Sequence, residues 1–179
     1  MATRKHNKDR IPQVRLIPEI NINKINLYMV SFIPVAGLQF NFSRLYENNF
    51  QFLIKNTVGY VENNELTGAY VYGSSVSQGD VGGSKTPTHY RLGINKKSNL
   101  VFYYSTFPDF ILSPKKILLF TIPLMKSDTY ESFFQIPSFS SDICMDNIII
   151  SDIGGSPIES ENIYSECITA AFEKDIKKA

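Results

Sequence analysis

The sequence predicts a mainly β fold: an antiparallel β-sandwich or barrel-like domain with one C-terminal amphipathic α-helix. Short apolar runs recur along the chain and are separated by loops rich in Gly, Pro, Asn and Ser. The 13 Phe and 10 Tyr favour pleated strands, on which flat rings pack well. No segment alternates strand and helix in the βαβ manner. With 179 residues, 43% of them hydrophobic, we expect one folded domain with a substantial core.

We expect a basic N-terminal arm over residues 1–12, a β domain over 13–153 and a helix over 156–178, and the two ends of the chain differ in charge. Residues 140–179 hold eight acidic side chains and three lysines, so the C-terminal part is acidic. Near the N-terminus Asp9 is outnumbered by five basic residues: Arg4, Lys5, Lys8, Arg10 and Arg15. A net charge of +1 argues against a uniformly basic nucleic-acid binder. Ends of opposite sign are typical of segments that meet each other, a neighbouring copy or different partners.

Strands are expected along the first third of the chain. Residues 13–17 lie between two prolines, a pattern typical of a sheet edge. Residues 25–33 are apolar on both alternating faces, which indicates a strand buried on both sides. Pro34 and Gly37 break this run, and residues 41–47 are compatible with either a short helix or a loop. Phe50, Phe52 and Ile54 alternate with polar residues and predict a half-buried strand.

Two hairpins are predicted in the middle of the chain. The first joins residues 58–62 to 66–72 through Asn63-Asn64-Glu65, because Asn tolerates the positive φ that tight turns need. The second joins residues 88–94 to 100–105 through a polar five-residue turn. Its first strand has the clearest two-residue period in the sequence, with His89 and Arg91 on the outer face.

The last third predicts two strands and the helix. Residues 115–124 are almost continuously apolar, which is typical of a central strand, and residues 143–153 supply the final strand. Ser156-Pro157-Ile158-Glu159 is a capping box with proline at the first helical position. Apolar residues then recur at helical spacing and include Ile168 and Phe172. We expect this helix to pack on its own β domain or on a neighbouring subunit.

A long loop of small residues runs from Gly73 to Pro87. It is glycine-rich and contains Lys85-Thr86, but the spacing of a phosphate-binding loop is absent and a strand follows where a helix is needed. We therefore interpret it as a presented surface loop. His89 with Asp80 is a candidate general base for a hydrolase, but no nucleophile is fixed near them in the sequence, which favours a protein without enzymatic activity.

Cys144 and Cys167 lack the spacing of a zinc site or a disulfide framework, so we predict two buried thiols and no cofactor. Neither a secretory signal nor an apolar run long enough to cross a bilayer is present, and residues 117–125 form the longest such run. The sequence therefore predicts a soluble protein without a membrane span, made in the cytosol.

For function, the sequence favours a structural assembly subunit, such as a capsid, minor virion or phage-particle component. Its partners would be other copies of itself or other subunits, which it would contact through the basic arm and surface loops. The arm is also a candidate for contact with a polyanion. The alternative is a glycan- or protein-binding β module that uses the 73–87 loop and a Tyr-rich surface at Tyr103 and Tyr104. A hydrolase is the third hypothesis. The candidate interaction residues are Arg4, Lys5, Lys8, Arg10, Arg15, Tyr103, Tyr104, Ile168 and Phe172.

Overall fold

The structure is a computed structural model that describes residues 12–21, 23–45, 50–54, 59–62, 66, 69–72, 90–95, 97–105, 110–126 and 142–169. Several residues and segments for which the sequence predicts a role lie outside these ranges. They are Arg4, Lys5, Lys8, Arg10, the 73–87 loop with Asp80, His89 and Phe172.

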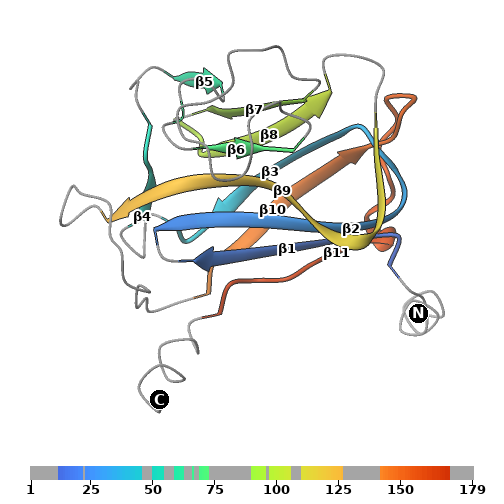
Figure 1. The fold of residues 1–179 in the computed structure, drawn as a ribbon, viewed down its shortest axis with the longest axis horizontal. Helices are drawn as coiled ribbons and strands as arrows, with labels where there is room; N and C mark the ends of the chain where they lie inside the picture. The colour runs from blue at the N-terminus through green and yellow to red at the C-terminus, as the bar shows by residue number, and fades with distance from the viewer. Residues whose placement is uncertain are drawn as a thin grey trace.

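The mainly β prediction is confirmed, and the strands form two sheets (Figure 1). The first sheet has the order β11-β1-β2-β9-β4, and β6 also pairs with β9. Its strands are β1 (Val14–Asn21), β2 (Lys24–Val35), β4 (Phe50–Phe52), β6 (Tyr70–Val71), β9 (Ile111–Lys126) and β11 (Ile163–Ser165). The second sheet has the order β10-β3-β8-β7-β5. Its strands are β3 (Gly37–Ser43), β5 (Tyr60–Glu62), β7 (Tyr90–Asn95), β8 (Leu100–Ser105) and β10 (Cys144–Ser151).

One hydrophobic core lies between the two sheets, as in a β-sandwich. Phe40 on β3 stacks on Phe120 of β9 at a ring-centroid distance of 6.3 Å. Tyr103 on β8 contacts the same Phe120 at 5.9 Å. Both Phe40 and Phe120 are fully buried, so rings from the second sheet meet the first sheet directly across the core.

The longest predicted strands and the second hairpin are confirmed. Residues 25–33 lie in β2, but Phe32 on one face of this strand is 50% exposed, so the predicted burial on both sides is wrong there. β9 runs between β2 and the short strands β4 and β6. Six consecutive residues of β9, 119–124, are buried, as expected for a central strand. β7 and β8 form an antiparallel hairpin in which Tyr90 pairs with Ser105 and Asn95 with Leu100.

The first predicted hairpin is wrong, because its two strands belong to different sheets. β5 pairs with β7 in the second sheet, whereas β6 pairs with β9 in the first. Val61 and Val71 are both buried in the common core from these opposite sides. A turn-forming sequence fixes only local geometry, and here the burial of these side chains decides which strands pair.

β3 is a strand that the sequence interpretation missed. The predicted break at Pro34 falls inside β2, at a point where the register with β9 is irregular between Ser31 and Val35. Proline is tolerated at such irregularities because the ladder hydrogen bond is already interrupted there. Leu38, Phe40 and Phe42 alternate with polar residues and are all buried, so the two-residue period was present in the sequence.

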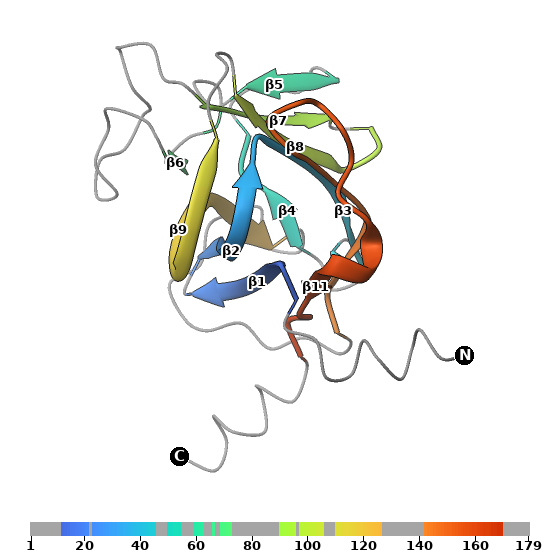
Figure 2. The same cartoon turned by 90° about the vertical axis from the view of Figure 1, so that its right-hand side faces the viewer.

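The predicted C-terminal α-helix is wrong for residues 156–169, and residues 170–179 lie outside the described ranges. Ser160–Asn162 form a single 3₁₀ turn, and β11 then pairs in parallel with β1. Isolated bridges join Pro157 to Ser151 and Ile168 to Ile143, both at the ends of β10. We call residues 156–168 the C-terminal clasp. Figure 2 shows this segment running along one side of the sandwich to reach β1.

Apart from the 3₁₀ turn, residues 156–168 are extended because an extended segment can pair its backbone groups with β1 and with the ends of β10 at once. A helix would leave those backbone groups without these partners. Glu166 donates its backbone N–H to the carbonyl of Leu16, and Ile158 donates its own to Ile150. The clasp is also fixed covalently, because Cys144 and Cys167 form a disulfide. The prediction of two buried thiols is therefore wrong. Within the described residues, no helix has the length and apolarity needed to span a bilayer.

Candidate functional site

The outer face of the second sheet carries an aromatic cluster over β5, β7 and β8. Because side chains alternate along a strand, Val61, Leu92 and Tyr103 point into the core while their neighbours point outward. The pairing register sets Tyr104 opposite Arg91, and Gly93 opposite both Phe102 and Glu62. We call the outward residues Tyr60, Glu62, Arg91, Phe102 and Tyr104 the aromatic face.

Three rings of the aromatic face form a stack that crosses the sheet. Tyr60 and Phe102 have ring centroids 5.2 Å apart and planes only 3° from parallel. Phe102 and Tyr104 follow at 6.0 Å and 27°. Aromatic pairs of this kind contribute about 0.5–1.5 kcal/mol beyond the area that they bury. The stack is therefore a stiff surface feature, although Tyr60 remains 40% exposed.

Gly93 makes this stack possible, since a side chain at that position would occupy the space that the rings fill. A Cβ atom added to Gly93 would lie 2.5 Å from Cε2 of Phe102 and 2.7 Å from Cε2 of Tyr60. Tyr60 pairs with Asn95 in the ladder, yet its ring leans over the glycine to reach Phe102. A glycine in the interior of a strand often marks such a close approach.

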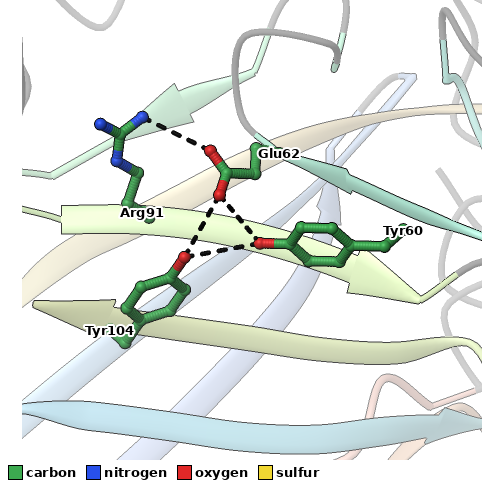
Figure 3. Close-up of polar contacts among 4 residues, drawn as sticks. All are labelled: Tyr60, Glu62, Arg91 and Tyr104. Atoms are coloured by element: carbon green, nitrogen blue, oxygen red, sulfur yellow. Dashed lines mark hydrogen bonds and ion pairs between the residues drawn. The ribbon is translucent and has the colours of Figure 1, made fainter. Parts of the chain in front are cut away.

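The polar groups of the aromatic face converge on Glu62 (Figure 3). The hydroxyls of Tyr60 and Tyr104 both donate to its Oε1 atom, at 3.0 and 3.3 Å. Nη1 of Arg91 lies 3.4 Å from Oε2. A partly exposed ion pair of this kind contributes at most about 1 kcal/mol to stability. Its main consequence is therefore to orient the side chains.

Burial of Tyr60 raises the pKa of its hydroxyl, and hydrogen bonds to Tyr104 and Glu62 raise it further. The hydroxyl is therefore protonated around neutral pH and acts as a hydrogen-bond donor. In this state it is neither a base nor an activated nucleophile. The arrangement is suited to holding a surface in a fixed shape.

A shallow depression of about 230 Å³ lies beside the stack on the same face of the sheet. Gly37 and Gln39 of β3, Tyr104 of β8 and Ile149 of β10 are among the residues that line it. Ile149 on β10 is 49% exposed. Small-molecule pockets usually measure about 300–1,000 Å³, so this depression is better matched to one side chain.

Tyr103 and Tyr104, which the sequence analysis assigned to one Tyr-rich surface, lie on opposite faces of the second sheet. Tyr103 is 2% exposed and donates its hydroxyl to the carbonyl oxygen of Tyr72 at 3.0 Å, so its assignment to a binding surface is wrong. The reason is that adjacent residues of a strand face opposite sides. Tyr104 lies on the aromatic face, where its role in an interaction stays a prediction.

Arg15 and Ile168 both make contacts within the chain. Nη2 of Arg15 lies 3.1 Å from Oε2 of Glu166, and its guanidinium lies 5.5 Å from the ring centroid of Tyr164. Ile168 is 9% exposed and packs in the core as part of the clasp. It is not part of a helix that docks on a neighbour.

Sequence reasoning missed most of the aromatic face. The two-residue period of residues 88–94 placed Arg91 on the outer face, but nothing local indicated that Tyr60 and Glu62 lie beside it. The usable signal was Gly93, a glycine inside an otherwise regular strand pattern. Among the described residues, no group of three or more His, Cys, Asp or Glu side chains is arranged to hold a metal ion.

Replacing Gly93 with alanine is expected to lower the free energy of unfolding by about 1–3 kcal/mol, the usual cost of overpacking. The added methyl group would force the rings of Tyr60 and Phe102 out of their stack. Urea denaturation measures the loss, and near-ultraviolet circular dichroism reports the displaced rings. Gly59→Ala is the matched control, because nothing lies within 4 Å of its added Cβ. Equal effects of the two substitutions would contradict the role assigned to Gly93.

No protein-family model and no curated protein matches this chain. Among solved structures, it is similar to a type I cohesin–dockerin complex from Clostridium thermocellum, with 9% identity, a TM-score of 0.45, and coverage of 88% of this chain and 91% of the other. It is also similar to a non-cellulosomal cohesin from Archaeoglobus fulgidus, with 9% identity, a TM-score of 0.42, and coverage of 92% and 97%. A cohesin in complex with a dockerin from Acetivibrio cellulolyticus matches with 8% identity, a TM-score of 0.45, and coverage of 86% and 94%.

Proposed function

We propose that this protein is a non-enzymatic protein-binding β module, and that the aromatic face with its adjacent depression is the binding surface. The observation that carries the proposal is the stack of Tyr60, Phe102 and Tyr104 on the outside of a sheet. The outer face of an antiparallel sheet is commonly polar. Aromatic residues and arginine are enriched at protein–protein interfaces and among the residues that dominate their binding energy.

The stacking supports a protein partner over a glycan. A sugar ring binds best on the open face of an aromatic ring, but the facing sides of Tyr60 and Phe102 are packed against each other. The depression beside the stack has the size of one apolar side chain, and Ile149 gives it an apolar wall. A partner that inserts one such side chain and packs against the ring edges would use both features.

The hydrogen bonds around Glu62 support the same function through rigidity. Tyr60 and Tyr104 are each held by a ring contact and a hydrogen bond, so little side-chain freedom remains to be lost when a partner binds. Immobilising a side chain on binding otherwise costs about 0.5–1.5 kcal/mol. A surface that is already ordered avoids this cost.

The proposal follows the alternative hypothesis from the sequence, and its binding surface differs from the one expected there. The assembly-subunit hypothesis depended on the basic arm, surface loops and the oppositely charged C-terminal segment. Residues 1–11 of the arm lie outside the described ranges, and residues 156–168 form the clasp in place of a helix. The hydrolase hypothesis depended on His89 and Asp80, which also lie outside the described ranges.

The disulfide supports the proposal that the protein works in an oxidising environment, since such bonds persist mainly outside the reducing cytosol. We therefore propose that the module binds its partner after leaving the cytosol in which the sequence predicts its synthesis.

The test begins with selection of binders from a displayed library of protein fragments of the source organism, followed by measurement of dissociation constants. We expect Tyr60→Ala and Tyr104→Ala each to weaken binding at least 10-fold, as residues at the centre of an interface do. Tyr164→Ala is the matched control, because Tyr164 is 48% exposed on β11 of the other sheet. We expect this control to change binding less than 3-fold.

Two outcomes would overturn the proposal. One is equal binding by the three variants, which would place the surface elsewhere. The other is binding on a glycan array that is lost with the same two tyrosines, which would replace the protein partner with a carbohydrate.

A further inference from the structure

A second pocket, distinct from the aromatic face, lies at the end of the sandwich where β1 begins. It has a volume of about 450 Å³, and we call it the end pocket. Ile33, Pro34 and Ile158 give it apolar walls, and Ile153 beside them is 61% exposed. The end pocket therefore combines an apolar interior with an open entrance.

The end pocket carries negative charge. Asp152 and Glu159 contribute to its lining, and none of the described lining residues is basic. Asp152 also holds the adjoining turn in shape, because its Oδ1 atom accepts the backbone N–H groups of Gly154 and Ser156 at 2.9 and 3.0 Å. Glu159 is exposed, so its carboxylate is open to a ligand from solution. A segment that pairs basic with apolar residues would complement this lining.

The N-terminal arm of the chain, residues 1–11, leads into the wall of the same pocket at Gln13. Gln13 lines the pocket and is fixed there, because its N–H donates to the carbonyl of Asn162 at 3.0 Å and its own carbonyl accepts from Phe32 at 2.9 Å. Residues 1–11, which lead into this point, contain four basic side chains and one acidic one, and Arg10 is followed by the apolar Ile11. Their charge is opposite to that of the pocket.

We propose that the end pocket is a docking site for the chain's own basic arm, residues 1–11, and that Glu159 pairs with its cationic side chains. The arm is attached to the pocket wall at Gln13, and this attachment favours the chain's own arm over the arm of a second copy. A short tether gives the arm an effective concentration of about 1 mM at the pocket. At a protein concentration of about 10 μM, the chain's own arm therefore outcompetes a neighbour's by roughly 100-fold.

The test uses the full chain and a synthetic peptide of residues 1–11. In an arm-neutral variant, Arg4, Lys5, Lys8 and Arg10 are replaced by Ser, which leaves the pocket open to the peptide. By calorimetry we expect the peptide to bind this variant about 10-fold more tightly than the unmodified chain if its intrinsic Kd is about 100 μM, since the tethered arm competes in the latter. This binding should weaken as salt is raised, because exposed ionic contacts are screened.

A charge reversal supplies the second measurement. In the unmodified chain, Glu159→Lys should raise the rate of trypsin cleavage within residues 4–10 several-fold by releasing the arm. Asp146→Lys is the control, because Asp146 is also exposed but lies near the other end of β10. Cleavage is followed by mass spectrometry.

Three results would overturn the proposal. Peptide binding that is absent, or equal in the arm-neutral variant and the unmodified chain, would show that the end pocket does not bind the arm. Equal cleavage rates in the two lysine variants would show that Glu159 does not hold the arm. A concentration-dependent dimer of the unmodified chain that the arm-neutral variant does not form would show that the occupant is a neighbour's arm.

Discussion

Replacing Tyr103 with alanine is expected to lower the free energy of unfolding by about 3–5 kcal/mol, the range for truncating a large buried ring. The ring of Tyr103 stacks on Tyr90 at 5.2 Å and contacts Phe120 across the core at 5.9 Å. Its hydroxyl also bonds to the carbonyl of Tyr72. The substitution would therefore leave a cavity between the sheets and remove one buried hydrogen bond.

Urea denaturation of two further variants separates these contributions. Tyr103→Phe keeps the ring and is expected to cost about 1 kcal/mol, the usual value of one hydrogen bond. Tyr104→Ala changes the adjacent residue on the outer face and should cost less than about 1.5 kcal/mol, since it removes one ring contact and exposed hydrogen bonds. Similar losses for Tyr103→Ala and Tyr104→Ala would contradict the assignment of these neighbours to opposite faces.

Replacing both cysteines with serine is expected to destabilise the fold by about 3 kcal/mol. The disulfide joins residues 23 apart in the sequence, and closing a loop of that length restricts the unfolded chain by about this amount. For a protein of this size, the loss corresponds to a melting temperature lower by about 6–12 °C. The effect is expected to exceed that of any single hydrogen bond in the clasp.

Thermal denaturation with and without a thiol reductant checks this result. The unmodified protein in reductant should melt near the temperature of the Cys144→Ser, Cys167→Ser double variant, and reductant should not shift the double variant. A melting temperature that is unchanged by reductant and by the double substitution would show that the bond does not hold the clasp.

Strands with a strong local pattern were predictable from the sequence. In residues 88–94, apolar and polar side chains alternate, which is the period of a strand with one buried face. The apolar run within β9 is typical of a central strand. The partners of the short strands were not predictable in this way. β5 and β6 have only three and two residues, so their local pattern is weak and core burial from opposite sheets decides their pairing.

The C-terminal segment shows how tertiary contacts override a consistent local signal. Ser156-Pro157-Ile158-Glu159 and the apolar spacing after it fit a helix, yet residues 156–169 are stabilised by two sheet edges and a disulfide. Helix signals contribute about 1 kcal/mol each, which several backbone pairs and a covalent bond exceed.

The candidate site was predicted only in part for a related reason. Tyr104 was identified because it is a tyrosine in a strand, but Tyr60, Glu62 and Arg91 reach it from segments more than ten residues away in sequence. Tyr60 reaches it only because β5 pairs with β7 and Gly93 leaves room for the ring. Neither condition is visible within a local window of sequence.

The clasp has a consequence for copies of this domain held close together. By pairing with β1 and bridging both ends of β10, it occupies backbone groups that would otherwise recruit a strand from a neighbouring molecule. Copies that stand side by side at high local density then have fewer open backbone groups on these two edges through which to join. Under such crowding, recognition at the aromatic face would depend on side chains, which differ between partners, and not on the backbone, which all proteins share.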